Sequence, residues 1–224
     1  MKEYNVISQS VALLDNVYSN LKLEQNQQIT VQVQNPFEQI VSSSLALKGI
    51  FSNIIKNFNV IEKQNSNLMH KEFLITNGNN YNIIYDFFPP RIELKCETKM
   101  TANQVIPIIQ KIIDFASIES KIGQIGINYE IFIKEDSFTI KDLLLKDKIS
   151  KEFTGLSATP VFQIDENTVL NLTLAGAVNT EDEKGIYIQA NFHNIVTNNN
   201  TINQIFNKDF LTIAKKKIDI IFDN

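Results

Sequence analysis

The sequence predicts an α+β fold in which antiparallel sheets carry their helices on one face. Segments with alternating apolar and polar residues, typical of half-buried strands, follow one another with short reversals between them. Each group of three strands precedes a segment with apolar residues at helical spacing. This pattern, strand-strand-strand-helix, occurs at 72–118 and again at 159–222. We therefore expect two pseudo-repeated halves, residues 1–135 and 136–224, either as two domains or as one continuous domain.

The composition is that of a globular protein. The 224 residues are 43% hydrophobic and 21% charged, and a chain of this length buries about 70% of the surface that its unfolded form exposes. This composition excludes an intrinsically disordered chain and a disulfide-stapled miniprotein. The net charge of -4 argues against a broad nucleic-acid-binding surface.

The first half opens with a predicted strand at 28–34, where apolar and polar residues alternate. A helix is expected at 37–58, because apolar residues recur there every three to four positions. Two further strands, at 72–76 and 81–88, flank the segment Asn77–Asn80. Asparagine and glycine adopt positive φ at low cost, so this segment predicts a tight reversal and a hairpin.

The rest of the first half is a strand at 91–97, a helix that starts at Thr101, and a strand at 122–134. Gln104, three residues after Thr101, completes a capping box. The apolar stripe of this helix consists of Val105, Ile108, Ile109, Ile112 and Ala116. The stripe has the period expected of a helix that packs on a sheet.

The second half is predicted to repeat the plan. A short helix is expected at 138–146, followed by three meandering strands at 159–164, 169–179 and 185–195. A closing helix is expected at 201–222, and the three asparagines that precede it supply N-cap groups.

The sequence contains no targeting or membrane signal. Residues 1–14 place charged and polar residues among broken apolar positions, so no signal peptide is predicted. No apolar stretch approaches the roughly 20 residues that a membrane-spanning helix needs. Cys96 is the only cysteine, which fits a reducing compartment. We expect a cytoplasmic protein without a membrane partner.

Catalytic and metal-binding patterns are missing. The two histidines, His70 and His193, belong to no paired motif, and together with Cys96 they match no metal-ligand spacing. No glycine-rich phosphate loop occurs. We therefore expect no metal, no cofactor and no catalytic residue. The alternatives are a nucleophilic Cys96, or a carboxylate pair of Glu93 and Glu97 on one strand face.

The basic residues suggest neither a phosphate clamp nor a nucleic-acid surface. Arg91 is the only arginine, so a multi-arginine clamp is excluded. Lys215-Lys216-Lys217 is the only basic run, and on a terminal helix such a run is typical of a solvated face.

The predicted hairpin is unusually aromatic. Tyr81, Tyr85 and Phe87 share one face of its second strand, and Phe88 lies on the other face. A strand that is apolar on both faces is either part of the core or covered by a partner. The candidate binding residues are therefore Tyr81, Tyr85, Phe87, Phe88 and Arg91.

Residues 81–133 resemble a sporadically distributed family of uncharacterised bacterial proteins. The likeness lies in a hairpin, a helix and a strand that carries the segment Ile125-Gly126-Ile127-Asn128-Tyr129, followed by a second sheet-plus-helix half. The chain lacks the acidic strand that this family has after its second meander. The family has no established activity, so the resemblance implies a fold and no site residue.

A more distant resemblance is to export chaperones of the SecB kind. These proteins combine a four-stranded antiparallel sheet with a long helix, form tetramers and bind unfolded clients in apolar grooves. The acidic net charge and the aromatic strand of this chain are similar to that pattern. The resemblance implies a chaperone function.

We expect a non-enzymatic, homodimeric module that binds a protein partner through strand edges and the aromatic hairpin. The reason is the lack of a catalytic constellation beside unusually apolar strands. The first alternative is a SecB-like chaperone for unfolded clients. Others are a small-ligand or nucleotide-binding enzyme that uses Arg91, Glu93 and His193, and a component of a host-defence or toxin-neutralising system.

Overall fold

The computed structural model describes residues 4–15, 44–52, 56–64, 66–67, 69–76, 80–86, 90–97, 105–116, 118, 122–134, 157–178 and 184–222. The strands in these segments are β1 (Tyr4–Asp15), β2 (Asn59–Glu62), β3 (His70–Thr76), β4 (Asn80–Asp86), β5 (Arg91–Glu97), β6 (Ile122–Lys134), β7 (Ser157–Ala158), β8 (Val161–Asp165), β9 (Thr168–Val178) and β10 (Lys184–Ile195). The helices are α3 (Ser44–Ser52), α4 (Val105–Ala116), α6 (Asn199–Phe206) and α7 (Phe210–Phe222). The α+β class predicted from the sequence is confirmed.

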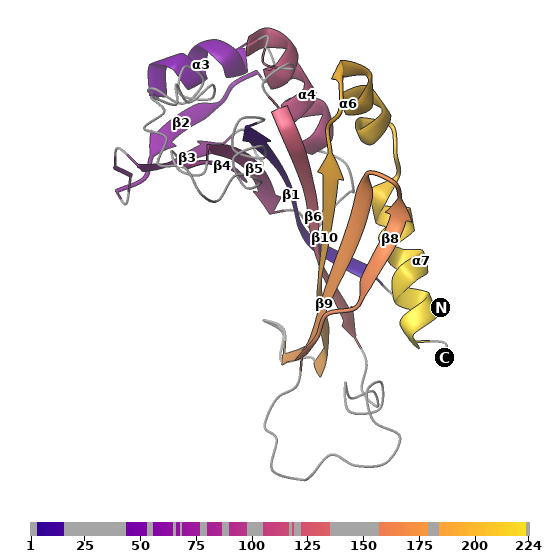
Figure 1. Ribbon diagram of the computed structural model, residues 1–224. Helices are drawn as coiled ribbons and strands as arrows, with labels where there is room; N and C mark the ends of the chain where they lie inside the picture. The colour runs from indigo at the N-terminus through magenta and orange to yellow at the C-terminus, as the bar shows by residue number, and fades with distance from the viewer. Residues whose placement is uncertain are drawn as a thin grey trace, which may run out of the picture.

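All described strands belong to one antiparallel sheet (Figure 1). Nine of them follow the order β2-β3-β4-β5-β1-β6-β10-β9-β7, and β8 pairs with β9 next to β7. The first strand, β1, lies in the middle of the sheet, between β5 and β6. Strands from both halves of the sequence therefore pair in one continuous sheet.

One face of the sheet is apolar and carries the helices. In the central strands the residues of this face lie directly opposite one another, for example Leu94, Val11, Ile127, Phe192 and Leu170. All five are completely buried, in one cluster with apolar residues of the helices. Because side chains of a strand alternate between faces, the cluster leaves a second, polar face. Figure 1 shows α3 and α4 over one end of the sheet and α6 and α7 over the other.

The strongest patterns were located correctly. The predicted strands at 91–97 and 122–134 are β5 and β6, and the predicted hairpin is β3 and β4. Val105, Ile108, Ile109 and Ile112 of the predicted apolar stripe are buried in α4, and residues 101–104 lie outside the described residues. The predicted strand at 28–34 and helix at 138–146 also lie outside them. Within 37–58, the structure describes helix α3.

The prediction of one closing helix at 201–222 is wrong, because the structure has two helices, α6 and α7, in its place. Asn198 caps α6 as expected, accepting a hydrogen bond from the backbone N–H of Thr201 at 3.1 Å. A second cap starts α7: Asp209 accepts hydrogen bonds from the Thr212 backbone N–H (3.1 Å) and hydroxyl (2.7 Å). A carboxylate at this position favours a new helix start over continuation of the old one.

Strand β1 was not predicted at all. Its middle, Ser8-Gln9-Ser10, interrupts the apolar alternation, and yet all three side chains are buried. Gln9 lies on the helix-covered face, opposite Tyr129 of β6. Its amide donates to the Tyr129 hydroxyl (3.2 Å), and its carbonyl accepts from the Val105 N–H at the start of α4 (3.3 Å). Because both the N–H and the carbonyl of its side-chain amide have hydrogen-bond partners, Gln9 is tolerated in the core.

The beginning of the chain packs against its last helix. The Tyr4 hydroxyl donates a hydrogen bond to Asp219 of α7, and Lys215 Nζ lies 5.4 Å from the centroid of the Tyr4 ring. Figure 1 accordingly shows the N- and C-termini near each other. Together with the pair of Phe192 and Phe210, whose ring centroids are 4.7 Å apart, these contacts hold α7 on the sheet.

Candidate functional site

The face of the sheet opposite the helices carries a row of polar residues. Lys95 of β5 lies opposite Ser10 of β1, which lies opposite Asn128 of β6. Asn128 lies opposite Asn191 of β10, and Asn191 lies opposite Asn171 of β9. Neighbouring strands are about 4.8 Å apart, so the five side chains form a line of roughly 19 Å across the sheet.

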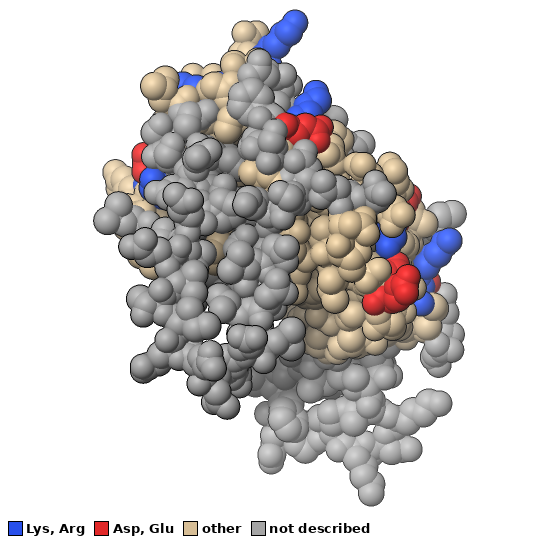
Figure 2. Space-filling model, turned by 45° about the horizontal axis from the view of Figure 1, so that its top comes forward, with Lys and Arg blue, Asp and Glu red and all other residues tan. Residues whose placement is uncertain are grey.

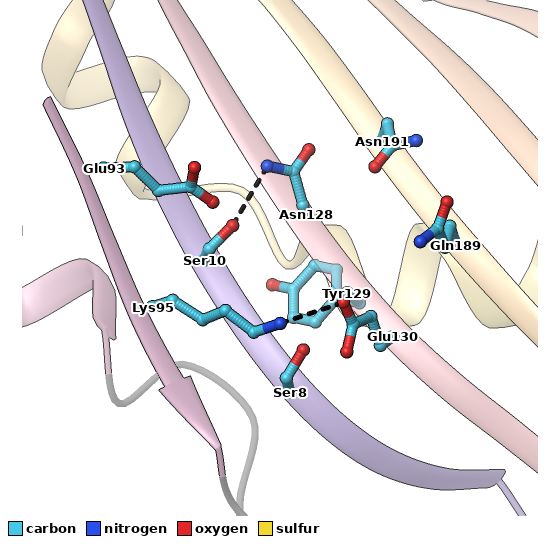
Figure 3. Close-up of a pocket in the computed structure, with 9 residues that line it drawn as sticks. All are labelled: Ser8, Ser10, Glu93, Lys95, Asn128, Tyr129, Glu130, Gln189 and Asn191. Atoms are coloured by element: carbon cyan, nitrogen blue, oxygen red, sulfur yellow. Dashed lines mark hydrogen bonds and ion pairs between the residues drawn. The ribbon is translucent and has the colours of Figure 1, made fainter. Parts of the chain in front are cut away.

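A pocket of about 150 Å³ lies in the middle of this polar face. Strands β5, β1, β6 and β10 all contribute to it, and Figure 3 shows the side chains that line it. The residues that line it are Ser8, Ser10, Glu93, Lys95, Asn128, Tyr129, Glu130, Gln189 and Asn191. Because these residues stand on paired strands in the centre of a sheet, their spacing is fixed by the hydrogen-bonded ladder.

Lys95 and Glu130 form the ion pair of the pocket, with Lys95 Nζ 3.0 Å from Glu130 Oε1 (Figure 3). Burial by itself would raise the pKa of Glu130. Hydrogen bonds from Ser8, Lys95 and Tyr187, with the charge of Lys95, outweigh burial and lower this pKa below its ordinary value. Glu130 is therefore ionised at neutral pH.

The amide side chains of the pocket keep unused hydrogen-bonding groups. Within the described part of the chain, Asn128 bonds only through Nδ2, which donates to Ser10 Oγ at 3.1 Å. Gln189 bonds only through Nε2, at 3.4 Å from the Tyr187 hydroxyl, and Asn191 makes no side-chain hydrogen bond there. Carbonyl oxygens of Asn128 and Gln189 and the whole amide of Asn191 are thus available to a ligand.

A second hollow lies at the edge of the sheet, between β8 and α7. It has a volume of about 320 Å³, and its walls are Ile164 of β8 with Ile213, Lys216, Lys217 and Ile220 of α7. We call it the edge groove. Three isoleucines form its apolar surface, and two lysines provide its positive charge.

The structure places two of the predicted binding aromatics in the core. Tyr81 is 5% exposed and Tyr85 is 2% exposed, both in the cluster under the helices. Both tyrosines therefore lie within the apolar cluster of the described residues. Phe87 and Phe88 lie outside the described residues.

Arg91 lies on the polar face, among charged neighbours. Its guanidinium donates to Glu93 and lies 3.8 Å from Asp86 Oδ2, while Asp86 Oδ1 lies 2.7 Å from His70 Nδ1. Arg91 is therefore linked to His70 through a carboxylate. His193 is not part of this group, because β1 and β6 separate β5 from β10, which makes a backbone separation of about 14 Å.

Cys96 is fully buried on the helix-covered face, where it lies opposite Gln9 and Tyr81. Among the residues that the structure describes, no group of three histidine, cysteine or acidic side chains could hold a metal ion.

No described helix has both the length and the apolar character needed to cross a bilayer.

Charges of both signs are mixed on the face of the molecule that Figure 2 shows. Blue and red side chains lie next to each other there, and the described surface between them is uncharged. This mixture agrees with the near-balance of 21 basic and 25 acidic residues.

The polar pocket was missed at the level of the sequence. A signal was present in β6, where Gln124, Asn128 and Glu130 occupy the face opposite the isoleucines. The polar partners on β1 and β10 become neighbours only through the strand order and register.

Comparison with known proteins adds no relative. No protein-family model matches the chain, and no curated protein shows a significant sequence match to it.

Proposed function

We propose that the protein is a non-enzymatic module that binds an extended segment of a protein partner at the edge formed by β8 and α7. The observation that carries the proposal is an open strand edge beside an apolar groove. No described strand pairs with the outer side of β8, and the edge groove lies next to it. Edges of this kind accept an added strand from another chain.

The backbone groups of β8 support strand addition. The Leu172 N–H donates to the Pro160 carbonyl oxygen at 2.9 Å, so that oxygen points toward β9. In an extended chain the next N–H points the opposite way, which directs the Val161 N–H away from the sheet. The Val161 side chain is 64% exposed, on the polar face with Asn171. An incoming strand would pair with these outward groups.

The edge groove supports a partner segment of alternating apolar and acidic residues. A strand added to β8 would place every second side chain beneath α7, next to Ile164 and Ile213. Ile220, at 48% exposed, would lose its contact with water. Lys216 and Lys217 line the same groove, and their charge favours a partner segment of net negative charge.

The strand order relates the two predicted halves to the proposed binding edge. The central pair β1 and β6 is flanked by β5 and β10, then by β4 and β9, then by β3 and β8. This order supports a pseudo-repeat about the central pair. At one end β2 extends the sheet beyond β3, whereas β8 has no further strand beyond it in the described residues. The asymmetry favours β8 as the edge that receives the partner.

The test is binding of a fluorescent synthetic octapeptide of alternating valine and glutamate to the full chain. Val161→Pro removes the outward N–H without touching the ladder to β9, since proline is tolerated at such edge positions. Val161→Thr keeps the N–H and is the matched control. We expect binding to the parent chain and to Val161→Thr, and at least ten-fold weaker binding to Val161→Pro. Equal affinity of the two variants would overturn the proposal.

Two other occupants of the edge are distinguished by parallel measurements. If the native mass of the protein is that of a dimer and Val161→Pro dissociates it, the occupant is a second copy of this chain. If unrelated unfolded proteins bind with the affinity of the peptide, the function is that of a SecB-like chaperone. The chaperone is our second candidate because a backbone edge and an apolar groove select no particular sequence.

A further inference from the structure

The polar pocket has its formal charges paired within the protein. Lys95 is bound to Glu130 at 3.0 Å, and Glu93 is bound to Arg91, which lies beside the pocket. Each of these four side chains is at least partly shielded from water, with Glu93 only 12% exposed. A charged ligand would therefore find no unpaired counter-charge, and would lose hydration without compensation.

The groups that remain for a ligand are neutral and come as donors next to acceptors. Asn128 and Asn191 face each other across β6 and β10, and Gln189 lies two residues along β10 on the same face. A carboxamide offers an N–H donor and a carbonyl acceptor side by side. Figure 3 shows Asn191 and Gln189 on one side of the pocket and the Glu93 carboxylate reaching in from the other.

From this arrangement we propose that the pocket binds a neutral polyhydroxylated molecule, such as a sugar ring. Each hydroxyl of such a ligand donates one hydrogen bond and accepts others, which matches a wall of carboxamides. The carbonyls of Asn128 and Gln189 accept from ligand hydroxyls, and the Asn191 amide donates to them. This site is independent of the β8 edge and of the partner proposed there.

The size of the pocket limits the ligand to one ring. The pocket has a volume of about 150 Å³. A dinucleotide or a larger cofactor needs several times that space. Additional rings of an oligosaccharide would extend over the polar row toward Asn171, which lies next to Asn191 but outside the pocket.

The test is a binding screen on the full chain with glucose, galactose, mannose, xylose and myo-inositol. Glucosamine and glucuronate serve as charged counterparts of one ring size. Saturation-transfer NMR detects binding, and titration calorimetry gives the affinity at 50 mM and 500 mM NaCl. We expect at least one neutral compound to bind more tightly than its charged counterparts, with an affinity that changes less than two-fold with salt.

Two variants locate the site. Asn191→Ala removes the amide that is open in the pocket, and we expect it to weaken sugar binding at least ten-fold. Asn171→Ala, on the adjacent strand of the same polar row, is the matched control and should leave the affinity unchanged. Both variants must keep the circular dichroism spectrum of the parent chain. The proposal is overturned if no neutral compound binds, if a charged counterpart binds best, or if the two variants behave alike.

Discussion

Lys208 Nζ lies 2.6 Å from Asp165 Oδ2, and this ion pair connects the short link between α6 and α7 to the end of β8, where the turn to β9 begins. The same ammonium group lies 3.1 Å from Thr168 Oγ1 at the start of β9. Because β8 and α7 form the two walls of the edge groove, this contact helps to set the distance between them.

The ion pair makes a pH-dependent contribution to stability. Burial alone would raise the pKa of Asp165, but hydrogen bonds from Lys208, from the Asn167 N–H and from Thr168 lower it below the ordinary value. A folded-state pKa below the unfolded one, which is about 3.9, stabilises the protein above that pH. The contribution is lost as the pH falls through the folded-state pKa.

We expect Asp165→Asn to lower the free energy of unfolding at pH 7 by about 0.5–1 kcal/mol, a modest value because water screens this partly exposed pair. Urea unfolding at pH 7, 4 and 2.5 measures the effect, and the difference from the parent chain should shrink as the pH falls. Glu166→Gln removes the same charge from the adjacent, exposed turn residue and is the control. Equal effects of both substitutions at pH 7 would show that the bond to Lys208 contributes nothing.

The aromatic hairpin gives a second prediction, about the core. We expect Tyr85→Ala to lower the free energy of unfolding by about 3–5 kcal/mol, because it empties a large, fully buried site. Ile84→Ala, at the preceding position on the polar face, should cost about 1 kcal/mol, because Ile84 is only half-buried. Urea unfolding followed by circular dichroism measures both. A small loss of stability for Tyr85→Ala together with loss of partner binding would instead place Tyr85 in an interface.

Alternation predicted the strands in which one face is consistently apolar. In β6, the isoleucines at 125, 127, 131 and 133 share a face with Tyr129, and this period of two has no helical interpretation. The same face is buried in the structure, so local sequence was sufficient there.

Strand β1 could not be predicted from alternation. Gln9 occupies a core position because Tyr129 and the start of α4 satisfy its amide, and both partners are about 100 residues away in sequence. The polar pocket was not predicted either, because its residues also come from distant parts of the sequence. Ser10, Asn128 and Asn191 are unremarkable polar residues until the register of three strands aligns them.

Gln9 and Tyr129 lead to a third prediction, on alkaline pH. Burial raises the pKa of Tyr129 well above its ordinary value, with the bond from Gln9 acting in the opposite direction. A raised folded-state pKa gives stability that is complete below the unfolded-state pKa, about 10, and declines as the pH rises above it. Tyr129→Phe should remove this decline.

At pH 8 we expect Tyr129→Phe to cost about 1 kcal/mol, since the Gln9 amide loses its acceptor. Between pH 8 and pH 11 the difference in the free energy of unfolding should shrink. Ionisation of Tyr129 stabilises the unfolded state of the parent chain as the pH rises, and Tyr129→Phe has no phenol to ionise at this position. Urea unfolding at the two pH values provides the comparison. A difference that stays constant would mean that Tyr129 ionises equally in the folded and unfolded states.

The fourth prediction concerns the charge of the edge groove. Lys216 lines the groove and is exposed, whereas Lys215 lies over the Tyr4 ring and Lys217 lies 5.3 Å from the centroid of the Phe162 ring. Lys216 is therefore the lysine that can be changed with the least loss of packing. We expect Lys216→Gln to weaken binding of the valine-glutamate peptide about two- to five-fold, the range of an exposed ion pair.

The dependence on salt and on position separates this effect from a general change of charge. Raising NaCl from 50 to 300 mM should remove most of the difference between Lys216→Gln and the parent chain, because surface ion pairs are screened over a few ångströms at that ionic strength. Lys48→Gln makes the same charge change at an exposed position of α3, which contacts β2 at the far end of the sheet, and should leave the affinity unchanged. If Lys48→Gln weakens binding as much as Lys216→Gln, the peptide responds to net charge and the groove does not select carboxylates.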